Sequence, residues 1–251
     1  MHRFSTTISW ITLVILMVGA RTSLADEILV AVASNFSGTI REIAERFEAS
    51  TAHKVKLTFG STGKHYAQII HGAPYDLFFA ADSRRPERLE QNGNALPQSR
   101  FTYAIGRLAL WSPLSGYVDS EGRVLEQNEF RHIAIANPKL APYGKAAQEI
   151  MQQRGVWRAL NGKAVRGENI GQTFQFVKSG NAELGFIAYS QIKRPAQPIT
   201  GSFWEVPQTL YTPIRQQAVV LKEGEAALAF AAFVKSPESL EIIRSFGYGT
   251  P

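Results

Sequence analysis

The sequence of 251 residues contains no cysteine. This absence excludes disulfide bonds, thiol catalysis and zinc sites built from cysteine. Charged residues make up only 19% of the chain, which carries a net charge of +6. The basic residues are scattered along the sequence, whereas a nucleic-acid-binding protein gathers them into one face. We therefore expect no nucleic-acid partner, and a soluble fold stabilised by burial of hydrophobic residues, which are 45% of the chain.

Motifs for catalysis are also lacking. Residues 60–64 look like part of a phosphate-binding P-loop, but the first glycine is too close and His65 replaces the required serine or threonine. The sequence has neither a G-x-S-x-G nucleophile elbow nor an H-E-x-x-H zinc motif. His65 and His71 have no metal-ligand spacing, so we expect both at the surface. Asp76 and Asp82 are expected in turns or caps. These absences argue against an enzyme and against a metal ion held by side chains.

The start of the chain predicts export. Residues 1–3 end in an arginine, residues 8–20 are almost entirely apolar, and Ser23-Leu24-Ala25 offers the small residues that signal peptidase recognises. Arg21 makes the apolar run shorter than the roughly 20 residues that a membrane-spanning helix needs. We therefore predict that residues 1–25 are a signal peptide and that the mature protein is periplasmic. An uncleaved membrane anchor is the alternative.

Apolar runs typical of buried strands alternate with helical patterns, which predicts an α/β fold. Residues 28–33, for example, are apolar throughout, and apolar residues then recur at helical spacing between residues 40 and 47. Thr39 is the expected cap of that first helix and Ser236 the expected cap of the last. Strands are predicted at residues 28–33, 55–59, 77–81, 103–111, 133–136, 184–189 and 217–221, with helices between them and two helices at the end of the chain.

The predicted strands and helices fall into two series, one on either side of the strand at residues 103–111. A stretch with four prolines, residues 195–213, precedes the last strand, and the chain then ends in helices that need a sheet to cover. These features predict two lobes, one formed by residues 26–106 together with 214–251 and the other by residues 107–213. A single domain is the alternative, because the length of the chain allows either.

Four loops that lead from a predicted strand into a helix share one feature. Residues 33–36, 60–63, 136–144 and 167–172 all combine small, hydroxyl or amide side chains with backbone N–H groups at a helix start. Unpaired N–H groups and the positive end of the helix dipole favour an anion at such a place. Each loop taken alone is an ordinary helix cap. Their repetition in both predicted lobes indicates a binding site for an anion.

At these loops the sequence resembles the periplasmic molybdate-binding proteins (ModA) of bacterial ABC importers. The resemblance covers essentially the whole mature chain. It implies an α/β fold of the type II periplasmic binding class, with two α/β lobes and a ligand cleft between them. The matching segments are Ala33-Ser34-Asn35-Phe36, Phe59 through Lys64, Gly72 through Phe78, Ala80-Ala81-Asp82, Gly106 through Ser112, Asn137 through Gly144, Gly167-Glu168-Asn169-Ile170, Ser236-Pro237-Glu238 and Phe246-Gly247-Tyr248.

The resemblance also implies which residues bind the ligand. Ser34 and Asn35 would contact one side of the anion, and Ser61 would add its hydroxyl and its N–H group. From the other lobe, Tyr143 and Ile170 would each contribute a backbone N–H group. Ile170 stands where the family often has valine, a change that a backbone donor tolerates.

The ligand implied by the family is molybdate or tungstate, carried as an oxyanion and not as a cofactor. The implied partner is the membrane permease of an ABC importer, with the binding protein acting as a monomer. Some relatives use a tyrosine near Ala188, but here that tyrosine is shifted to Tyr189, so we leave it outside the site. Two alternatives remain open from the sequence: a binding protein for another oxyanion such as sulfate or phosphate, and an exported enzyme that acts on phosphate or sulfate esters.

Overall fold

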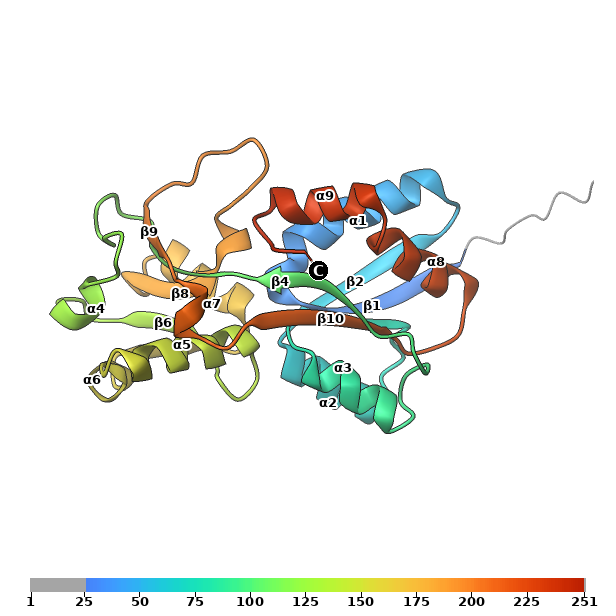
Figure 1. The fold of residues 1–251 in the computed structure, drawn as a ribbon, viewed down its shortest axis with the longest axis horizontal. Helices are drawn as coiled ribbons and strands as arrows, with labels where there is room; N and C mark the ends of the chain where they lie inside the picture. The colour runs from blue at the N-terminus through green and yellow to red at the C-terminus, as the bar shows by residue number, and fades with distance from the viewer. Residues whose placement is uncertain (1–25, 251) are drawn as a thin grey trace, which may run out of the picture.

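The computed structural model describes residues 26–250. The predicted signal peptide lies outside the described residues. The described chain forms two five-stranded mixed sheets, each covered by helices, which lie side by side along the long axis of the molecule (Figure 1). We call each sheet with its helices a lobe. Within residues 26–250 no helix is both long and apolar enough to cross a membrane.

The first lobe is built on a sheet with the strand order β2-β1-β3-β10-β4. Strand β10 runs antiparallel to its two neighbours, whereas β1 is parallel to β2 and β3. Helices α1, α8 and α9 cover one face of this sheet, and α2 and α3 cover the other (Figure 1). The elements are β1 (Glu27–Ala33), β2 (Lys54–Gly60), β3 (Leu77–Ala80), β4 (Phe101–Gly106), β10 (Ile214–Val220), η1 (Ser34–Phe36), α1 (Ser37–Ser50), α2 (Thr62–Ile70), α3 (Arg84–Gln91), α8 (Glu225–Val234) and α9 (Pro237–Ser245).

The second lobe is built on a sheet with the strand order β7-β6-β8-β5-β9. Helix α5 packs on one face of this sheet and α7 on the other, so each face has its own hydrophobic cluster. The elements are β5 (Leu108–Ser112), β6 (Ile133–Ala136), β7 (Ala164–Gly167), β8 (Leu184–Ala188), β9 (Ser202–Glu205), α4 (Val124–Gln127), α5 (Pro142–Gln153), α6 (Trp157–Asn161), α7 (Ile170–Lys178), η2 (Tyr189–Gln191) and η3 (Gln208–Leu210).

The chain crosses between the lobes twice. The first crossing lies between Gly106 and Leu108, and the second lies between β9 and β10. The prediction of one strand over residues 103–111 is therefore wrong, because the run is two strands that belong to different sheets. Strand β4 pairs with β10, and β5 pairs with β8 and β9. A continuous apolar run shows that residues are buried, but it carries no information about which sheet they join.

Four other elements differ from the sequence-based expectation. Helix α1 begins at Ser37, after the 3-10 turn η1, and Thr39 is buried inside it and does not cap it. Helix α3 and strands β7 and β9 were not predicted. Helix α3 carries mainly charged residues, and Leu89 is its one fully buried leucine. A single apolar residue gives no helical spacing of apolar positions, so the sequence did not predict this helix. The N-cap prediction for Ser236 is confirmed, since its side chain accepts a hydrogen bond from the N–H of Ser239.

Candidate ligand-binding cleft

A small pocket lies between the lobes, where four helical segments begin. The segments η1 and α2 come from the first lobe, and α5 and α7 come from the second. The cavity volume, counted as room for the centre of a water-sized sphere, is about 10 Å³, which is room for about one water molecule. Every residue that lines it is uncharged. The lining consists of Ala33, Ser34, Asn35, Gly60, Ser61, Thr62, Ala81, Ala141, Pro142, Tyr143 and Ile170.

All five residues that the resemblance implied, Ser34, Asn35, Ser61, Tyr143 and Ile170, lie in the wall of this one pocket. They come from four loops that are up to 136 positions apart in the sequence. The carboxyl ends of β1, β2, β6 and β7 bring them together, because each of these strands is followed by one of the four loops. Ligand sites in open α/β sheets form at such strand ends.

Ser34 and Asn35 form the start of η1, directly after β1. The Oγ of Ser34 accepts a hydrogen bond of 3.0 Å from the N–H of Gly171, so this serine touches both lobes. The side chain of Asn35 points away from the pocket, into a buried network. Its Nδ2 donates to Oε1 of Gln216 at 2.6 Å and to the hydroxyl of Tyr248 at 3.1 Å. The group that Asn35 has available for a ligand is therefore its backbone N–H, at a helix start where N–H groups lack intrahelical partners.

Ser61 caps helix α2, and its Oγ accepts a hydrogen bond of 3.3 Å from the N–H of Lys64. Thr62 follows it in the wall of the pocket and accepts a hydrogen bond of 3.0 Å from the N–H of Ala81. Sequence reasoning included Thr62 in the loop but did not select it. Ser61 and Thr62 are both hydroxyl residues at a helix start, so the sequence did not distinguish between them. Only the tertiary structure shows that the Thr62 hydroxyl holds the end of β3 against this loop.

The second lobe contributes the starts of α5 and α7. Pro142 is the first residue of α5 and Tyr143 the second, so the N–H of Tyr143 lies in the first turn, where it has no partner within the helix. Asn169 caps α7 by accepting a hydrogen bond of 3.0 Å from the N–H of Gln172, which leaves the N–H of Ile170 at the open end. Both backbone donors therefore point along the helix axis towards the cleft.

The two lobes touch each other around the pocket. The N–H of Gly63 donates to the carbonyl of Leu140 at 2.9 Å, and Nζ of Lys64 lies 3.1 Å from Oε1 of Glu168. On another side, the Oγ of Ser190 lies 3.2 Å from the carbonyl oxygen of Asn35. These contacts join residues of different lobes, so the structure shows the lobes closed over the pocket.

Buried tyrosine hydroxyl groups lie at the pocket wall, at Tyr143, and behind Asn35, at Tyr248 and Tyr103. Burial raises the pKa of Tyr103, Tyr143 and Tyr248, so all three phenols keep their protons at physiological pH. The hydroxyl of Tyr248 donates to the carbonyl of Asn35 at 2.8 Å and accepts from Ser190 at the same distance. These three hydroxyl groups are therefore polar but carry no formal charge.

His65 is buried with only 2% of its surface exposed, so the prediction of a surface position is wrong. It lies on α2 behind the loop that carries Ser61, and its Nδ1 is 3.1 Å from Oε1 of Gln68. A Cβ atom at Gly60 would stand 2.9 Å from its Nε2, so the ring fills space that the glycine leaves open. The helical spacing of His65 from Thr62 and Ile69 could have placed this histidine on the inner face of α2, but a single histidine is ambiguous by sequence.

We expect the free energy of unfolding to fall as the pH drops from about 7 to about 5. Burial lowers the pKa of His65, so below its ordinary value of about 6.5 the unfolded chain binds this proton and the folded protein does not. The stabilisation is complete above that pH and is lost as the pH falls towards the lowered pKa, by up to about 1.4 kcal/mol per pH unit. Urea unfolding at several pH values measures the slope, which His65→Gln should flatten.

Carboxylates with lowered pKa, namely Glu48, Asp119 and Glu183, lose their contribution only at lower pH, because their ordinary values are 4.5 and 3.8. The window above pH about 5 therefore isolates the histidine. An identical slope in the His65→Gln protein would assign the pH dependence to another group.

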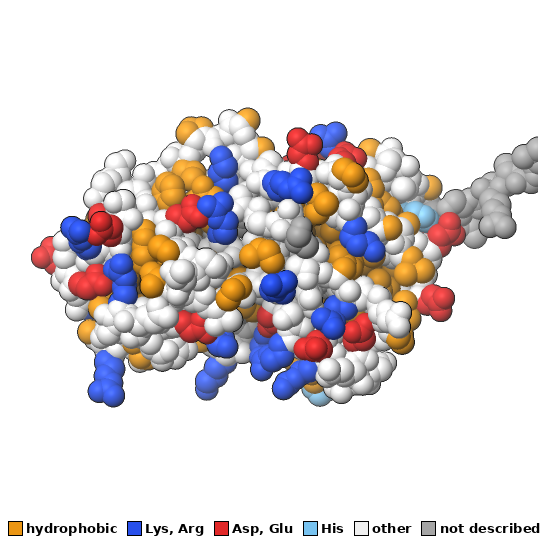
Figure 2. Space-filling model, in the orientation of Figure 1, with side chains coloured by type: hydrophobic (Ala, Val, Ile, Leu, Met, Phe, Trp, Pro, Cys, Tyr) orange, Lys and Arg blue, Asp and Glu red, His pale blue; other side chains and the backbone are white. Residues whose placement is uncertain are grey.

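A wider groove adjoins the small pocket and shares its walls at Ala81, Ala141 and Pro142. Its volume, counted in the same way, is about 580 Å³. Figure 2 shows Lys and Arg side chains gathered along the lower edge of the molecule, in the region of α3 and α5. The five basic residues that line the groove are Arg84, Arg85, Lys139, Lys145 and Arg215. Two acidic residues, Asp82 and Glu149, also line the groove and pair with Arg85 and Lys145, so five basic and two acidic residues leave it with a net charge of +3. The residues that line the small pocket itself are uncharged.

Tyr189 lies outside the pocket. The guanidinium of Arg107 stacks 4.7 Å from the centre of its ring, and the ring of Phe203 is 6.0 Å away. Within the described residues, Asp76 and Asp82 have structural partners: Asp76 accepts a hydrogen bond of 2.7 Å from the N–H of Leu29, and Asp82 pairs with Arg85. No group of three His, Asp or Glu side chains in residues 26–250 could hold a metal ion.

Two α/β lobes that are joined by two crossings and closed over a pocket of helix starts define a solute-binding protein with the type II arrangement. The family model described as bacterial extracellular solute-binding protein matches residues 28–249. Molybdate-binding protein ModA of Azotobacter vinelandii is 49% identical over 228 residues, which are 90% of each chain. ModA of Rhodobacter capsulatus is 48% identical over 229 residues, which are 90% of this chain and 89% of that one.

A solved structure, the periplasmic molybdate-binding protein of Azotobacter vinelandii, matches with a TM-score of 0.86 at 44% sequence identity. The match covers 89% of this chain and 99% of that chain. This chain therefore belongs to the family of bacterial extracellular solute-binding proteins and, within it, to the ModA molybdate-binding proteins.

Proposed function

We propose that this chain is the periplasmic substrate-binding component of an ABC importer and that it holds molybdate or tungstate between its lobes. The observation that carries the proposal is the convergence of four helix starts on one small pocket lined only by uncharged residues. The relatives at 48–49% identity, which are named molybdate-binding proteins, support the choice of ligand. Residues 26–106 with 214–251 form one lobe in this proposal, and residues 107–213 form the other.

Neutral donors are sufficient for a buried dianion when there are enough of them. An unsatisfied charge in a protein interior is very costly, so each ligand oxygen needs partners. A hydrogen bond to a charged group contributes roughly 1.5–3 kcal/mol, so five to seven of them would support tight binding after the cost of closing the lobes. In this proposal the donors are the hydroxyls of Ser34 and Ser61 and the backbone N–H groups of Asn35, Ser61, Tyr143 and Ile170.

A pocket of fixed donors selects its ligand by size. Sulfate has the same charge and shape as molybdate but shorter bonds, so in a cavity built for the larger anion its hydrogen bonds would be stretched. The backbone donors lie on helix starts that are packed into the two sheets, which limits how far they can follow a smaller ligand. Molybdate and tungstate should therefore bind much more tightly than sulfate or phosphate.

The remaining parts of the proposal concern where and with whom the protein acts. The chain leaves the cytoplasm by means of the signal peptide predicted at residues 1–25 and works in the periplasm as a monomer. Closure of the lobes over the anion presents the loaded form to the membrane permease of the importer. The protein catalyses no reaction in this proposal, and the metal enters the site only as part of the oxyanion.

Titration calorimetry of the protein spanning residues 26–251 tests this function with molybdate, tungstate, sulfate and phosphate. We expect tight 1:1 binding of the first two and weak or no binding of the others. Binding of sulfate or phosphate alone would contradict the proposal that the ligand is molybdate or tungstate, but it would leave the proposal of a solute-binding protein intact. If none of the four anions binds and the protein hydrolyses a chromogenic phosphate or sulfate ester, the alternative of an exported esterase would be favoured instead.

Ser61→Ala is expected to weaken molybdate binding by about 10- to 100-fold, since it removes one hydrogen bond to a charged ligand. It also removes the cap of α2, which costs about 1 kcal/mol of stability. Ser236→Ala is a matched control, because Ser236 caps α9 in the same way and is not part of the pocket. The control should lose similar stability and keep full affinity. Equal affinity in the two folded variants would remove Ser61 from the site.

A further inference from the structure

The two chain crossings between the lobes meet at one residue pair. Gly106 ends β4 and Ile214 begins β10, and these two residues face each other across the two strands. Two residues further on, the N–H of Leu108 donates to the hydroxyl of Tyr211 at 3.2 Å, already within the second lobe. Any rotation of one lobe against the other must therefore bend the chain next to the Gly106–Ile214 pair.

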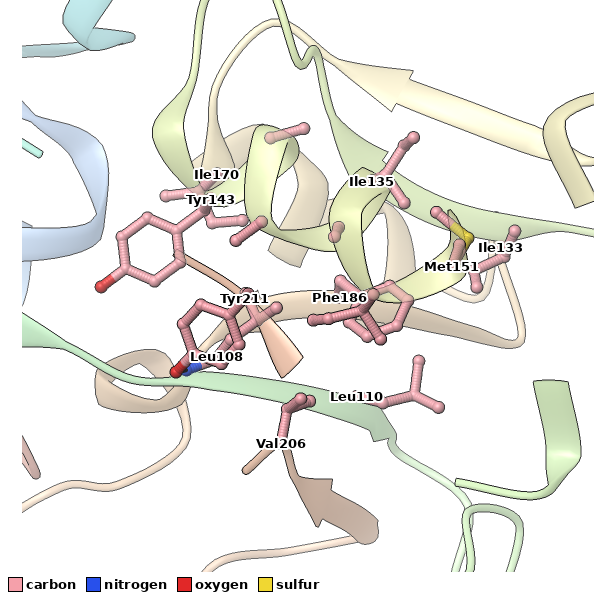
Figure 3. Packing of buried hydrophobic residues seen from close by; sticks show 14 of the residues in the cluster. Leu108, Leu110, Ile133, Ile135, Tyr143, Met151, Ile170, Phe186, Val206 and Tyr211 are labelled. Atoms are coloured by element: carbon pink, nitrogen blue, oxygen red, sulfur yellow. Dashed lines mark hydrogen bonds between the residues drawn. The ribbon is translucent and has the colours of Figure 1, made fainter. Parts of the chain in front are cut away.

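Tyr143 reaches this pair from the second lobe. Its ring lies beside Tyr211, above the strand that carries Leu108 (Figure 3). The side chain is 1% exposed, and its hydroxyl has no hydrogen-bond partner within the described chain. A Cβ atom built on Gly106 would overlap that hydroxyl and would lie 3.0 Å from Cγ2 of Ile214. The Tyr143 hydroxyl thus occupies the space that Gly106 leaves empty.

Two further facts show that this contact is unusual. Burial raises the pKa of the Tyr143 hydroxyl, and the Asn35 side chain of the first lobe partly opposes this rise. Asn35 makes no hydrogen bond of normal length and angle with this hydroxyl, so hydrogen bonding alone does not explain the position of the buried group. The backbone of Gly106 is not in the left-handed region, so its conformation does not require glycine. The requirement at this position is therefore space, and the atom that uses the space belongs to the other lobe.

We propose that Tyr143 and Gly106 are positioning residues that set how far the lobes close. We call the Gly106–Ile214 pair, where the two chain crossings meet, the hinge. The Tyr143 hydroxyl contacts Gly106 at this hinge, and the backbone N–H of the same tyrosine faces the pocket. The contact at the hinge therefore fixes the distance of this donor from the donors of the first lobe. This inference rests on the proposed function, because it assigns to the same pocket the feature that sets its size and hence its selectivity.

A double-mutant cycle tests the contact by comparing Gly106→Ala in the wild-type and Tyr143→Phe backgrounds. In the wild-type background the new methyl group meets the hydroxyl, so we expect molybdate to bind at least about tenfold more weakly. The ratio of molybdate to sulfate affinity should fall as well, because the donors stay further apart. In the Tyr143→Phe background the hydroxyl is gone, and the atoms nearest to the new methyl group are Cζ of residue 143 and Cγ2 of Ile214, both at 3.0 Å. The same substitution should therefore cost less affinity there, by less than about threefold.

Small-angle X-ray scattering at saturating molybdate provides a second measurement, because a folded Gly106→Ala protein should keep a larger radius of gyration than the closed wild type. Gly162→Ala is the control, since a Cβ there meets nothing within 4 Å. An unchanged affinity and selectivity in Gly106→Ala, or an equal loss in both backgrounds, would overturn the inference. Absence of oxyanion binding by the wild-type protein would instead overturn the proposed function.

Discussion

Ser34→Asp is expected to abolish molybdate binding, with a loss of at least a thousandfold, while the protein remains folded. Ser34 is 7% exposed and lies in the pocket wall, where its Oγ accepts a hydrogen bond from the N–H of Gly171. An aspartate at this helix start could accept the same bond and would favour the closed arrangement of the lobes. It would also place a negative charge beside the bound dianion. Two unit charges about 4 Å apart repel by about 4 kcal/mol at an effective dielectric constant of about 20.

Ser34→Asn is the control that separates charge from size, because asparagine has nearly the same shape without the charge. It should bind molybdate more weakly than the wild type but far more tightly than Ser34→Asp. Calorimetry measures the affinities, and thermal unfolding with and without molybdate verifies them independently, since only a ligand that binds the native state raises the melting temperature. Similar affinities for the two variants would show that the pocket does not hold an anion next to this residue.

Gly144→Ala is expected to lower both stability and affinity, although alanine is the better helix former. Gly144 is the third residue of α5, and a Cβ atom there would overlap the carbonyl oxygen of Ala136 at the end of β6. The helix start would have to move away from the sheet, at a cost of about 1–3 kcal/mol. Tyr143 would move with it, so its N–H would leave the position that faces the pocket. We expect molybdate affinity to fall by about tenfold or more.

Gly162→Ala is the matched control for this prediction. Gly162 follows helix α6 with φ −72°, and a Cβ atom there would have open space. The substitution should leave stability unchanged or raise it by up to about 1 kcal/mol, the usual difference between the two residues in ordered helical backbone. Urea unfolding compares the two variants, and calorimetry compares their affinities. If the Gly144→Ala protein keeps the stability and the molybdate affinity of the wild type, close packing of α5 on β6 does not hold the N–H of Tyr143 in place.

The candidate site was predictable from the sequence to the level of its loops. Each of the four loops follows an apolar run and contains residues that are typical of a helix start. This pattern involves only neighbouring residues, so it can be recognised in the sequence. The loops are residues 33–36, 60–63, 136–144 and 167–172. The sequence did not predict which atom of each loop faces the pocket. Asn35, predicted to contact the anion, turns its amide towards Gln216 and leaves only its backbone N–H for a ligand. That orientation depends on a partner 181 positions away, which no local pattern reveals.

By itself, the sequence determined the alternation of strands and helices, the small, hydroxyl and amide side chains of the loops, and the resemblance to the family. The first two follow from periodicity and from side-chain chemistry over a few neighbouring residues, whereas the family followed from the resemblance of many segments along the chain. Only the tertiary structure decided that β4 pairs with β10 while β5 pairs with β8 and β9, that His65 is buried, and that Tyr143 meets Gly106 at the hinge. The physical reason is that pairing and burial at these positions depend on residues from distant parts of the chain, whose meeting is fixed by packing of the whole fold.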